Sequence, residues 1–508
     1  MPWVAGGLLI LGSLALQVWP RRFRPLYGID VWRHFLIARY LRAHGHLPGH
    51  GELPNHLFPE GTDYPPLFRI LVASIPEKWW MPLQCCLAPL FDACHALTLL
   101  IGAYCLTGDG RLALAAVVAY GCNPLIVLEN SNLSSRSFSS LLFTWTVGAL
   151  IAWWATGQWG WLALGVGLMA LLLLSHRLAV QALAVLLALF GIVEHSWRWP
   201  GLLLAAMALA VVLSGGFYLQ VLRGHVLMLA YWAKNSANRY AHLIRGFTKP
   251  AGRPTDFALV VYRALSRCPA IAVFAGFPMA FLALAAVWLW RGGVLPIPPS
   301  FPPSALRLMA AWTVGLLAWG VLVRQIPPLR FLGEGERYGE YAAFPAAILT
   351  SLVVGWGINT SAAPFVWGGF FGFALVAGIL PAIVLQQRLI VRDVDRSVTD
   401  AHRQIYETVR QEMRRGPVRL MAFPHGLVDP LTYFTDCPVL ATDSSLAHWR
   451  YYSDFSPVFK KPVWDIVQRF RITHLLVSDR FVTVEELRLP ACTLVACAGP
   501  LQLLRVSA

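Results

Sequence analysis

A carboxylate and an imidazole lie four residues apart near the N-terminus, within the segment YGIDVWRH at residues 27–34. On a helix this spacing places Asp30 and His34 on the same face. A carboxylate at a membrane boundary is costly to desolvate and tends to serve a function, and suitable neighbours would allow Asp30 to act as a base. The structural alternative is an aspartate that caps a solvated amphipathic helix.

Three further short motifs bring polar side chains to the edges of apolar runs. In TDYPPLF (62–68) the proline pair presents Asp63 and Tyr64, although a structural turn is the alternative. In NSNLSSRSF (130–138) Arg136 lies among small hydroxyl residues at a helix start, where a guanidinium and free backbone N–H groups could bind an anion. The SHR sequence at 175–177 repeats this pattern with His176 and Arg177. Positive charges that only anchor helices would explain the same residues.

The last motif, LGEGERYGEY at 332–341, packs carboxylates, an arginine and tyrosines before an apolar run. It would suit recognition of an acceptor hydroxyl or a metal ion, and a solvated loop is the alternative. Its candidate residues are Glu334, Glu336, Arg337, Tyr338 and Glu340.

Composition excludes a single water-soluble domain. Hydrophobic residues make up 57% of the 508 residues and charged residues only 13%, against about 25% charged in soluble domains. The net charge of +15 would suggest nucleic acid in a soluble chain. Residues 388–508, however, hold 16 Lys and Arg against 13 Asp and Glu, a net of +3 that leaves +12 in the membrane part. We therefore expect lipid head groups or a phosphorylated substrate as partners, and no nucleic acid.

The apolar runs predict a polytopic α-helical membrane protein with about eleven transmembrane helices, followed by a C-terminal soluble α/β domain. Residues 1–387 form the transmembrane module, with a long first loop at 21–80 and another long loop at 223–268; residues 388–508 form the soluble domain. The predicted spans are 3–20, 81–106, 112–128, 137–156, 159–175, 178–193, 200–222, 269–290, 305–323, 343–359 and 364–387.

In the soluble part, apolar spacing predicts a helix that Gly416 can close, strands at 418–423, 438–442 and 472–478, a helix at 462–470 and a hairpin at 492–506. Counting the spans places both long loops, the candidate residues and the tail on one side of the membrane. Loops on the other side carry little charge.

These motifs together resemble the GT-C superfamily of integral-membrane glycosyltransferases, which use polyprenyl-phosphate or polyprenyl-diphosphate sugar donors. The resemblance rests on GIDVWRH, LRAHGHLP and DYPPLF in the first loop, on SSRSF and SHRLAVQ, on GERYGEY, and on a helix that leads into THLLVSD in the tail. It covers most of the chain, and each motif is short.

The resemblance implies transfer of a sugar from a polyprenyl-phosphate (or diphosphate) donor to a glycan, lipid or protein acceptor, with inversion, at the extracytoplasmic face. Asp30 matches the essential acidic residue of the first external loop and would be the base. Arg136, His176, Arg177 and Arg337 would stabilise the leaving phosphate. GIDVW has one aspartate in place of a DxD pair, so no cofactor is certain and a divalent cation is left open.

Two other classes remain open: a transporter or flippase for a lipid-linked sugar, and a non-catalytic scaffold for glycan assembly. A transporter should carry charges or broken helices at the bilayer midplane, whereas the charges here cluster at one boundary, which favours an enzyme. The orientation conflicts with the positive-inside rule, because the basic side should be cytoplasmic. That rule weakens for long loops, and we retain the extracytoplasmic assignment.

Overall fold

The computed structural model describes residues 2–28, 30–49, 52, 55–58, 61–236, 269–360, 363–392, 397–440, 451, 454 and 459–506, with 269–272 as backbone only. The chain divides into two compact units, each made of three separate segments. A helical unit comprises Met1–Phe23, Gln84–Tyr218 and Phe257–Val391, and an α/β unit comprises Arg24–Leu83, Leu219–Asp256 and Arg392–Ala508. Residues 223–234 of the expected loop 223–268 are helical, as the end of the helix Phe217–Lys234, and the loop lies outside the described residues from 237 onward.

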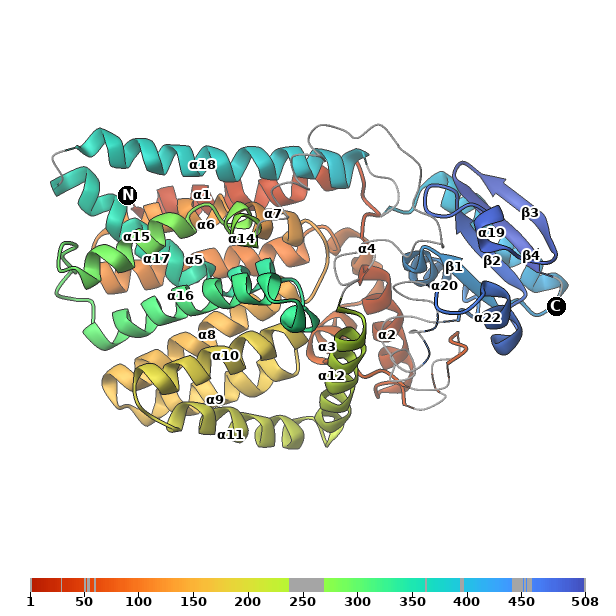
Figure 1. Cartoon of the computed structure of the whole chain (residues 1–508), viewed down its shortest axis with the longest axis horizontal. Helices are drawn as coiled ribbons and strands as arrows, with labels where there is room; N and C mark the ends of the chain where they lie inside the picture. The colour runs from red at the N-terminus through yellow and green to blue at the C-terminus, as the bar shows by residue number, and fades with distance from the viewer. Residues whose placement is uncertain are drawn as a thin grey trace. The chain divides into compact units, whose positions relative to one another are not determined.

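The helical unit is a bundle whose long helices run side by side (Figure 1). Its helices are α1 (Pro2–Val18), α5 (Leu87–Thr107), α6 (Gly110–Gly121), α7 (Pro124–Asn130), α8 (Arg136–Thr156), α9 (Trp159–Leu173), α10 (Arg177–Val193), α11 (Arg198–Leu213), α14 (Pro269–Gly276), α15 (Ala280–Arg291), α16 (Pro303–Gln325), α17 (Tyr338–Thr360) and α18 (Pro364–Gln386). Short 3-10 turns over Trp19–Arg22, Pro327–Leu332 and Gly335–Arg337 and a π-helical turn over Gln387–Arg392 join or extend them.

Helix α17 lies at the centre of this bundle. It contacts α5, α6, α8, α10, α15, α16 and α18, and nearly every residue from Tyr338 to Val354 is buried. Its sequence, YGEYAAFPAAILTSLVVGWGINT, is rich in alanine and glycine. Small side chains allow neighbouring helices to approach closely in a membrane, so the composition of α17 accounts for its central place.

Helices α6 and α7 form one apolar run that bends by 63°. Asn123 lies between them and accepts a hydrogen bond from the Leu125 amide, which makes it the N-cap of α7, and Pro124 occupies the first helical position. Both features favour a new helix start at this point. Because of the bend, α7 does not continue in the direction of α6, and its last turn carries Glu129 and Asn130.

Several described helices are long and apolar enough to cross a membrane. Six pass by length and composition, or seven if the bent pair α6–α7 is one span, and α9, α10, α11 and α15 are shorter apolar helices. Every apolar run predicted from the sequence contains a helix. The structure confirms a mostly helical chain with several helices of spanning length and a small sheet, while the count of eleven spans stays a prediction.

The α/β unit holds a four-stranded sheet of order β1-β2-β4-β3. Its β1–β2 pair is parallel and its other pairs are antiparallel. The elements of this unit are α2 (Asp30–His44), α3 (Leu67–Ser74), α4 (Trp80–Leu83), most of α12 (Phe217–Lys234), α19 (Asp400–Arg415), β1 (Leu420–Phe423), α20 (Val428–Thr435), α22 (Val463–Phe470), β2 (His474–Ser478), β3 (Cys492–Ala498) and β4 (Leu501–Val506), with 3-10 turns at Glu77–Trp79, His425–Leu427 and Glu485–Leu487.

Alternate residues of the strands face two separate cores. In β2, Leu476 packs with α19 and α20, while Leu475 and Val477 pack with α22. Because successive strand side chains point to opposite faces, the run LLV is buried on both sides. Helices therefore cover both faces of the sheet, as in an α/β sandwich.

Acidification is expected to destabilise the α/β unit through His402. The buried ring accepts the Thr399 backbone N–H at Nδ1, 3.2 Å away, and burial lowers its pKa to about 4. The unfolded chain, with a histidine pKa of about 6.5, therefore binds the proton first, and stability is lost as the pH falls below about 6.5. At pH 5 the loss from this residue is about 2 kcal/mol. Thermal unfolding in detergent at pH 7 and pH 5 should show a smaller loss of stability on acidification in His402→Gln than in the natural protein. An equal loss in the two proteins would contradict the assignment.

Candidate functional site

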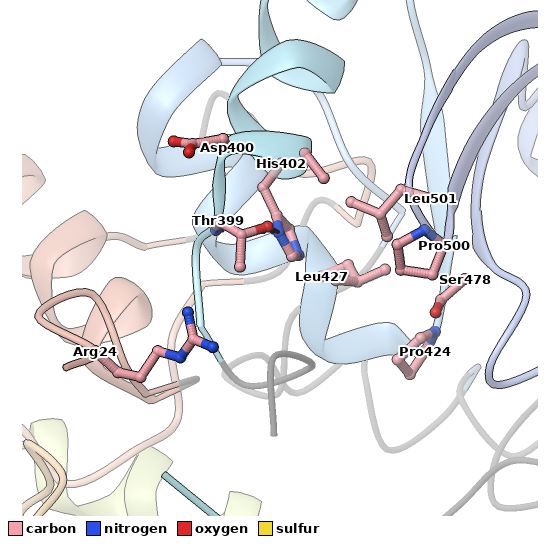
Figure 2. Close-up of a pocket in the computed structure, with 10 residues that line it drawn as sticks. Arg24, Thr399, Asp400, His402, Pro424, Leu427, Ser478, Pro500 and Leu501 are labelled. Carbon is pink, nitrogen blue, oxygen red and sulfur yellow. Dashed lines mark hydrogen bonds between the residues drawn. The ribbon is translucent and has the colours of Figure 1, made fainter. Parts of the chain in front are cut away.

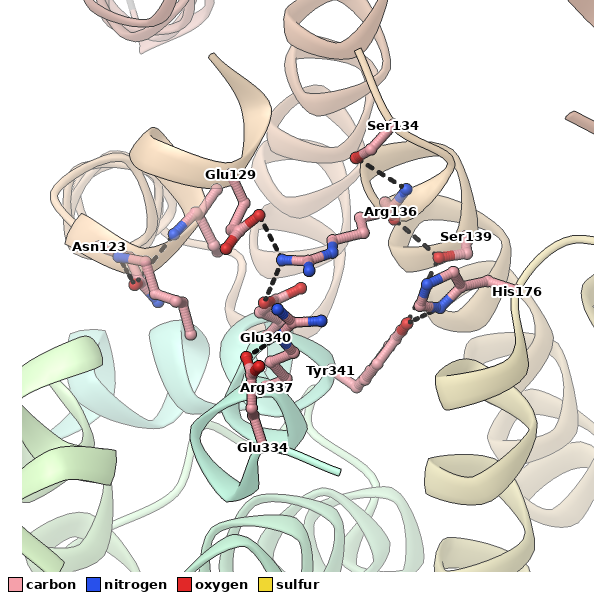
Figure 3. Close-up of polar contacts among 12 residues, drawn as sticks. Asn123, Glu129, Ser134, Arg136, Ser139, His176, Glu334, Arg337, Glu340 and Tyr341 are labelled. Atoms are coloured by element: carbon pink, nitrogen blue, oxygen red, sulfur yellow. Dashed lines mark hydrogen bonds and ion pairs between the residues drawn. The ribbon is translucent and has the colours of Figure 1, made fainter. Parts of the chain in front are cut away.

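Arg136 lies between two carboxylates at the start of α8. Its guanidinium pairs with Glu129 from the last turn of α7 and lies 3.7 Å from Oε1 of Glu340 on α17. The side chain of Arg136 is 11% exposed and that of Glu340 is 5% exposed. Figure 3 shows the three side chains directed toward one another from three different helices. A buried charge of this kind is stable only when it is paired.

A second ion pair adds to the first. Arg337 Nε lies 2.5 Å from Glu334, and both residues interact electrostatically with Glu129 and Glu340. This arginine–glutamate cluster therefore sets two guanidinium groups against three carboxylates. Glu340 Oε1 is a buried acceptor that receives no hydrogen bond within the described part of the chain. It is therefore a position where a hydroxyl group could donate.

His176 joins the helical unit's polar cluster through Tyr341. Its Nδ1 lies 3.1 Å from the Tyr341 hydroxyl, which is also 3.4 Å from Ser139 Oγ on α8. The indole of Trp312 donates to the Tyr341 carbonyl oxygen at 2.8 Å. Because Tyr341 follows Glu340 directly, these contacts fix the first turn of α17 (Figure 3).

The other predicted residues of this motif bind partners at its edges. Tyr338 donates to Gln181 on α10 at 2.9 Å, and Glu336 pairs with Arg324 at 2.5 Å. Arg177 is buried at the start of α10. The structure thus brings Arg136, His176, Arg337 and Glu340 into linked contacts, with Glu336 and Tyr338 anchoring the motif to α16 and α10. Their roles toward a substrate stay predictions.

In the α/β unit, Asp30 is the first residue of α2. Its carboxylate is partly exposed and forms no hydrogen bond or ion pair in the part of the chain that the structure describes. One turn later His34 is buried, with its ring 6.4 Å from that of Tyr64 and 5.0 Å from that of Phe68. The predicted helical spacing of Asp30 and His34 is present, and Asp30 alone of the two is accessible.

Asp63 is buried beneath α12, where Gly224 allows a close approach. A Cβ at Gly224 would overlap the carboxylate and lie 2.6 Å from the Cβ of Asp63. Gln220 of α12 also donates to the Thr62 carbonyl oxygen at 2.6 Å, and Thr62 accepts a 2.6 Å hydrogen bond from Arg69. The TDYPP segment is thus fixed from both sides.

Gly224→Ala should destabilise the chain, although alanine usually stabilises a helix interior relative to glycine by about 0.5–1 kcal/mol. Overlap with Asp63 reverses the sign, and we expect a loss of about 1–3 kcal/mol, as for overpacking. Gly167→Ala on α9 is the matched control, because a Cβ there meets nothing within 4 Å. Denaturant titration of both variants in detergent measures the difference; equal effects would mean that Asp63 does not press on α12.

A second buried network surrounds Asp92 on α5, and the motifs in the sequence did not predict it. The Asp92 carboxylate accepts hydrogen bonds from Gln17 and Tyr120, each at 2.6 Å, and from Asn130. The Tyr120 hydroxyl also lies 2.9 Å from Nδ1 of His95, whose Nε2 is 2.8 Å from the Thr144 hydroxyl. With Asp92 ionised, Tyr120 donates to it, His95 donates to Tyr120 and Thr144 donates to His95. One hydrogen-bond chain therefore joins α1, α6, α5 and α8.

This network meets the arginine–glutamate cluster at the end of α7. Asn130 donates to Asp92, and the residue before it, Glu129, pairs with Arg136. An ionisable residue within an apolar run is a signal for a functional or structural polar site. Asp92 and Glu129 carry that signal in the sequence, whereas the motif at 130–138 starts one residue too late to include Glu129.

Asp92→Asn should lower the free energy of unfolding by about 1–3 kcal/mol, because its new NH₂ group would replace one of the two acceptor oxygens and face the donor from either Gln17 or Tyr120. Cys94→Ala, at an exposed position of the same helix, is the control and should change little. Unfolding by SDS titration provides the measurement. A neutral Asp92→Asn would show that the network does not need a carboxylate.

The described residues do not form a metal centre. Among them, no group of three or more His, Cys, Asp or Glu side chains is placed to hold a metal ion. The carboxylates of Glu129, Glu334 and Glu340 are already paired with arginine. These residues do not fit a divalent cation, and we derive no step through one.

The sequence matches no family model and no curated protein. Similar solved structures do exist. The archaeal oligosaccharyltransferase AglB from Archaeoglobus fulgidus matches with a TM-score of 0.58 and 12% identity, over 94% of this chain and 69% of its own. ArnT from Cupriavidus metallidurans matches with 0.55 and 13%, over 99% and 97%. The chain has the GT-C fold.

The GT-C fold also extends to the mycobacterial arabinofuranosyltransferase AftD, with a TM-score of 0.52 and 15% identity, over 99% of this chain and 40% of that one. These neighbours are glycosyltransferases. ArnT was solved bound to undecaprenyl phosphate, and AglB with an inhibitory peptide and a dolichol-phosphate, and separately with Zn and sulfate. At such low identity the likeness establishes the GT-C fold of this chain, which agrees with the resemblance found in its motifs.

Proposed function

We propose that this protein is a multi-pass membrane glycosyltransferase that moves a sugar from a polyprenyl-phosphate (or diphosphate) donor to an acceptor hydroxyl. The observation that carries the proposal is the buried arginine–glutamate cluster of the helical unit in a chain with the GT-C fold. Fold neighbours that were solved with polyprenyl phosphates support the donor class. ArnT gives the broadest support, because nearly its whole length is matched.

In this reaction the acceptor oxygen attacks the anomeric carbon, the bond from that carbon to the phosphate oxygen breaks, and the configuration inverts. A base must take the hydroxyl proton, and cations must stabilise the leaving phosphate. We assign the base to Asp30, which has no partner within the described residues. We assign stabilisation of the leaving phosphate to Arg136 and Arg337. His176 and Arg177 would contribute to the same stabilisation.

The pairing of Arg136 suggests how phosphate would enter. Glu129 holds the guanidinium closely, whereas the oxygen of Glu340 is 3.7 Å away and receives no hydrogen bond from the described residues. A phosphate oxygen could replace Glu340 at Arg136 and form a shorter, charge-assisted contact. Glu340 would then be available to accept from an acceptor hydroxyl. The carboxylates thus keep the arginines ordered before the substrate arrives.

The active face and the soluble domain at 388–508 would be extracytoplasmic, as the resemblance implies. Arginines at short loops lose their value as topological markers if they bind phosphate, which removes part of the conflict with the positive-inside rule. The orientation can be tested with two cysteine variants, Trp197→Cys and Asp465→Cys, at exposed positions that we expect on opposite sides of the membrane. Each variant is treated in intact cells with an impermeant maleimide. Reaction at position 465 and protection at 197 would support it.

Mass spectrometry of lipids that copurify with the chain tests the donor class. An isoprenoid phosphate that copurifies with the natural protein and is depleted in Arg136→Gln supports the proposal. The transporter and scaffold alternatives are separated by proteoliposomes loaded with that lipid-linked sugar and an acceptor extract. A new glycosidic product supports the enzyme, and lipid translocation without any such product would overturn it.

A further inference from the structure

The α/β unit contains a cavity of about 350 Å³ that none of the roles above uses. It lies at the carboxyl ends of the two parallel strands, since Pro424 follows the last residue of β1 and Ser478 is the last residue of β2. The start of α19 and the turn between β3 and β4 complete its wall (Figure 2). Crevices at the carboxyl ends of parallel strands are the usual ligand sites of open α/β sheets.

The first turn of α19 directs hydrogen-bond donors at this cavity. Thr399, Asp400, Ala401 and His402 all line it. The His402 N–H donates to the Thr399 side chain and the Arg403 N–H to the Thr399 carbonyl oxygen, which leaves the N–H groups of Asp400 and Ala401 as the first-turn donors that a ligand could use. The backbone N–H and the hydroxyl of Thr399 both form hydrogen bonds to Nδ1 of His402 and are not available to a ligand. The free backbone N–H groups and the dipole of this 16-residue helix favour binding of an anion at its N-terminus.

His402 is a donor in its neutral form. A backbone N–H can only donate, so the contact from Thr399 means that Nδ1 of His402 carries no proton. The single ring proton then lies on Nε2. His402 is 5% exposed and lines the cavity, so this N–H is offered to whatever occupies the space.

Ser478 provides an independent indication of a ligand. Its side chain is buried, with 4% exposure, and lines the cavity, yet its hydroxyl has no hydrogen-bond partner within the described ranges. The small exposed fraction of this residue lies in a position that lines the cavity, so the hydroxyl can donate to or accept from a group that occupies the space. A ligand oxygen at this position would satisfy the hydroxyl.

Charge and shape narrow the ligand class. Figure 2 shows the Arg24 guanidinium turned toward Thr399, which adds a cation to the wall. The one carboxylate of the wall, Asp400, is 92% exposed, pairs with Arg403 and points away from Ser478. Apolar side chains line the remainder, namely Pro424, Leu427, Pro500 and Leu501.

We propose that this cavity binds the phosphate group of a compact phosphorylated molecule, with the phosphate between His402, Ser478, Arg24 and the start of α19. Donors that converge from four directions suit the several oxygens of a phosphate better than the two of a carboxylate. The volume lies at the lower end of the range for small-molecule sites, about 300–1,000 Å³, which suits a phosphorylated sugar or a lipid headgroup. The site is separate from the residues assigned to sugar transfer, and it stands or fails independently of that proposal.

The test is binding to the purified full chain in detergent, followed by isothermal titration calorimetry. The probes are glucose 6-phosphate and inorganic phosphate, with glucose as the uncharged control. Vesicles of phosphatidylcholine with or without phosphatidic acid, added as competitors, identify the source of the phosphate. Saturable binding of glucose 6-phosphate or inorganic phosphate supports the site. If vesicles with phosphatidic acid displace the bound phosphate and vesicles of phosphatidylcholine alone do not, the site is assigned to a lipid headgroup. If neither kind of vesicle displaces it, the site is assigned to a soluble metabolite.

Variants place the ligand in the cavity. Arg24→Gln should weaken binding about tenfold or more and Ser478→Ala about fivefold, as expected for one charged and one neutral hydrogen bond. Arg403→Gln makes the same change of charge on α19 at a residue outside the cavity wall and should leave the affinity unchanged. Circular dichroism and thermal unfolding check that each variant is folded. Absence of saturable phosphate binding would overturn the proposal. So would folded Ser478→Ala and Arg24→Gln variants that bind phosphate with the affinity of the natural protein.

Discussion

Asp30→Asn should reduce sugar transfer by about 10²–10⁴-fold, the contribution of a general base, while the donor lipid stays bound. Asparagine keeps the shape of the side chain but removes its negative charge and its ability to take a proton. Because the Asp30 carboxylate forms no hydrogen bond or ion pair within the described residues, its loss should leave the fold intact. The measurements are kcat with a radiolabelled lipid-linked sugar, and lipid retention by mass spectrometry.

A matched control separates the carboxylate from its place in a helix. Asp465 is also an acidic residue in the first turn of a helix, α22, and is exposed. Asp465→Asn should therefore transfer sugar at the natural rate. Turnover in Asp30→Asn that equals that of Asp465→Asn would remove Asp30 from the mechanism and leave Glu340 as the next carboxylate to test.

Arg136→Gln should have the second large effect, on both stability and transfer. It leaves Glu129 and Glu340 buried without their shared cation, and breaking a buried pair in this way costs about 3–5 kcal/mol. If Arg136 also stabilises the leaving phosphate, the rate should fall by a further 10²–10³-fold in the folded fraction. Denaturant titration and single-turnover kinetics measure the two effects separately.

The double variant Glu129→Gln/Arg136→Gln distinguishes structure from chemistry. Removal of one carboxylate relieves the uncompensated charge, so most of the lost stability should return, whereas transfer should not. Arg403→Gln is the control, since Arg403 pairs with Asp400 and both side chains are mostly exposed, at 65% and 92%, and such pairs contribute about 0–1 kcal/mol. Recovery of transfer in the double variant would mean that Arg136 only neutralises Glu129.

Hydrophobic patterning predicted the helices well because the membrane forces each span to satisfy its own backbone. It also predicted α19, α22, β1, β2 and the final hairpin, whose apolar spacing is regular. The break at Asn123 was hidden within one apolar run, since a bend leaves mean hydropathy unchanged. Its cap and proline were nevertheless present as local signals.

The polar side chains were harder to predict than the helices. Arg136, Arg337 and Glu340 were found because they stand at the ends of apolar runs, where charges are conspicuous. Asp92 and His95 lie inside such a run, and their partners Gln17, Tyr120 and Thr144 come from three other helices. Only the tertiary packing of α1, α5, α6 and α8 turns these scattered residues into one network.

The discontinuous α/β unit has a consequence for synthesis of the chain. Arg33 on α2 and Asp429 beside it on α20 form a buried ion pair across 396 positions of sequence. At about 5–20 residues per second, a ribosome would finish α2 roughly 20–80 s before it makes Asp429. During that interval Arg33 and the aromatic side chain of Trp32 on α2 lack the partners that α20 provides in the folded unit. The α/β unit therefore cannot complete its packing around α2 until the C-terminal part of the chain has been synthesised.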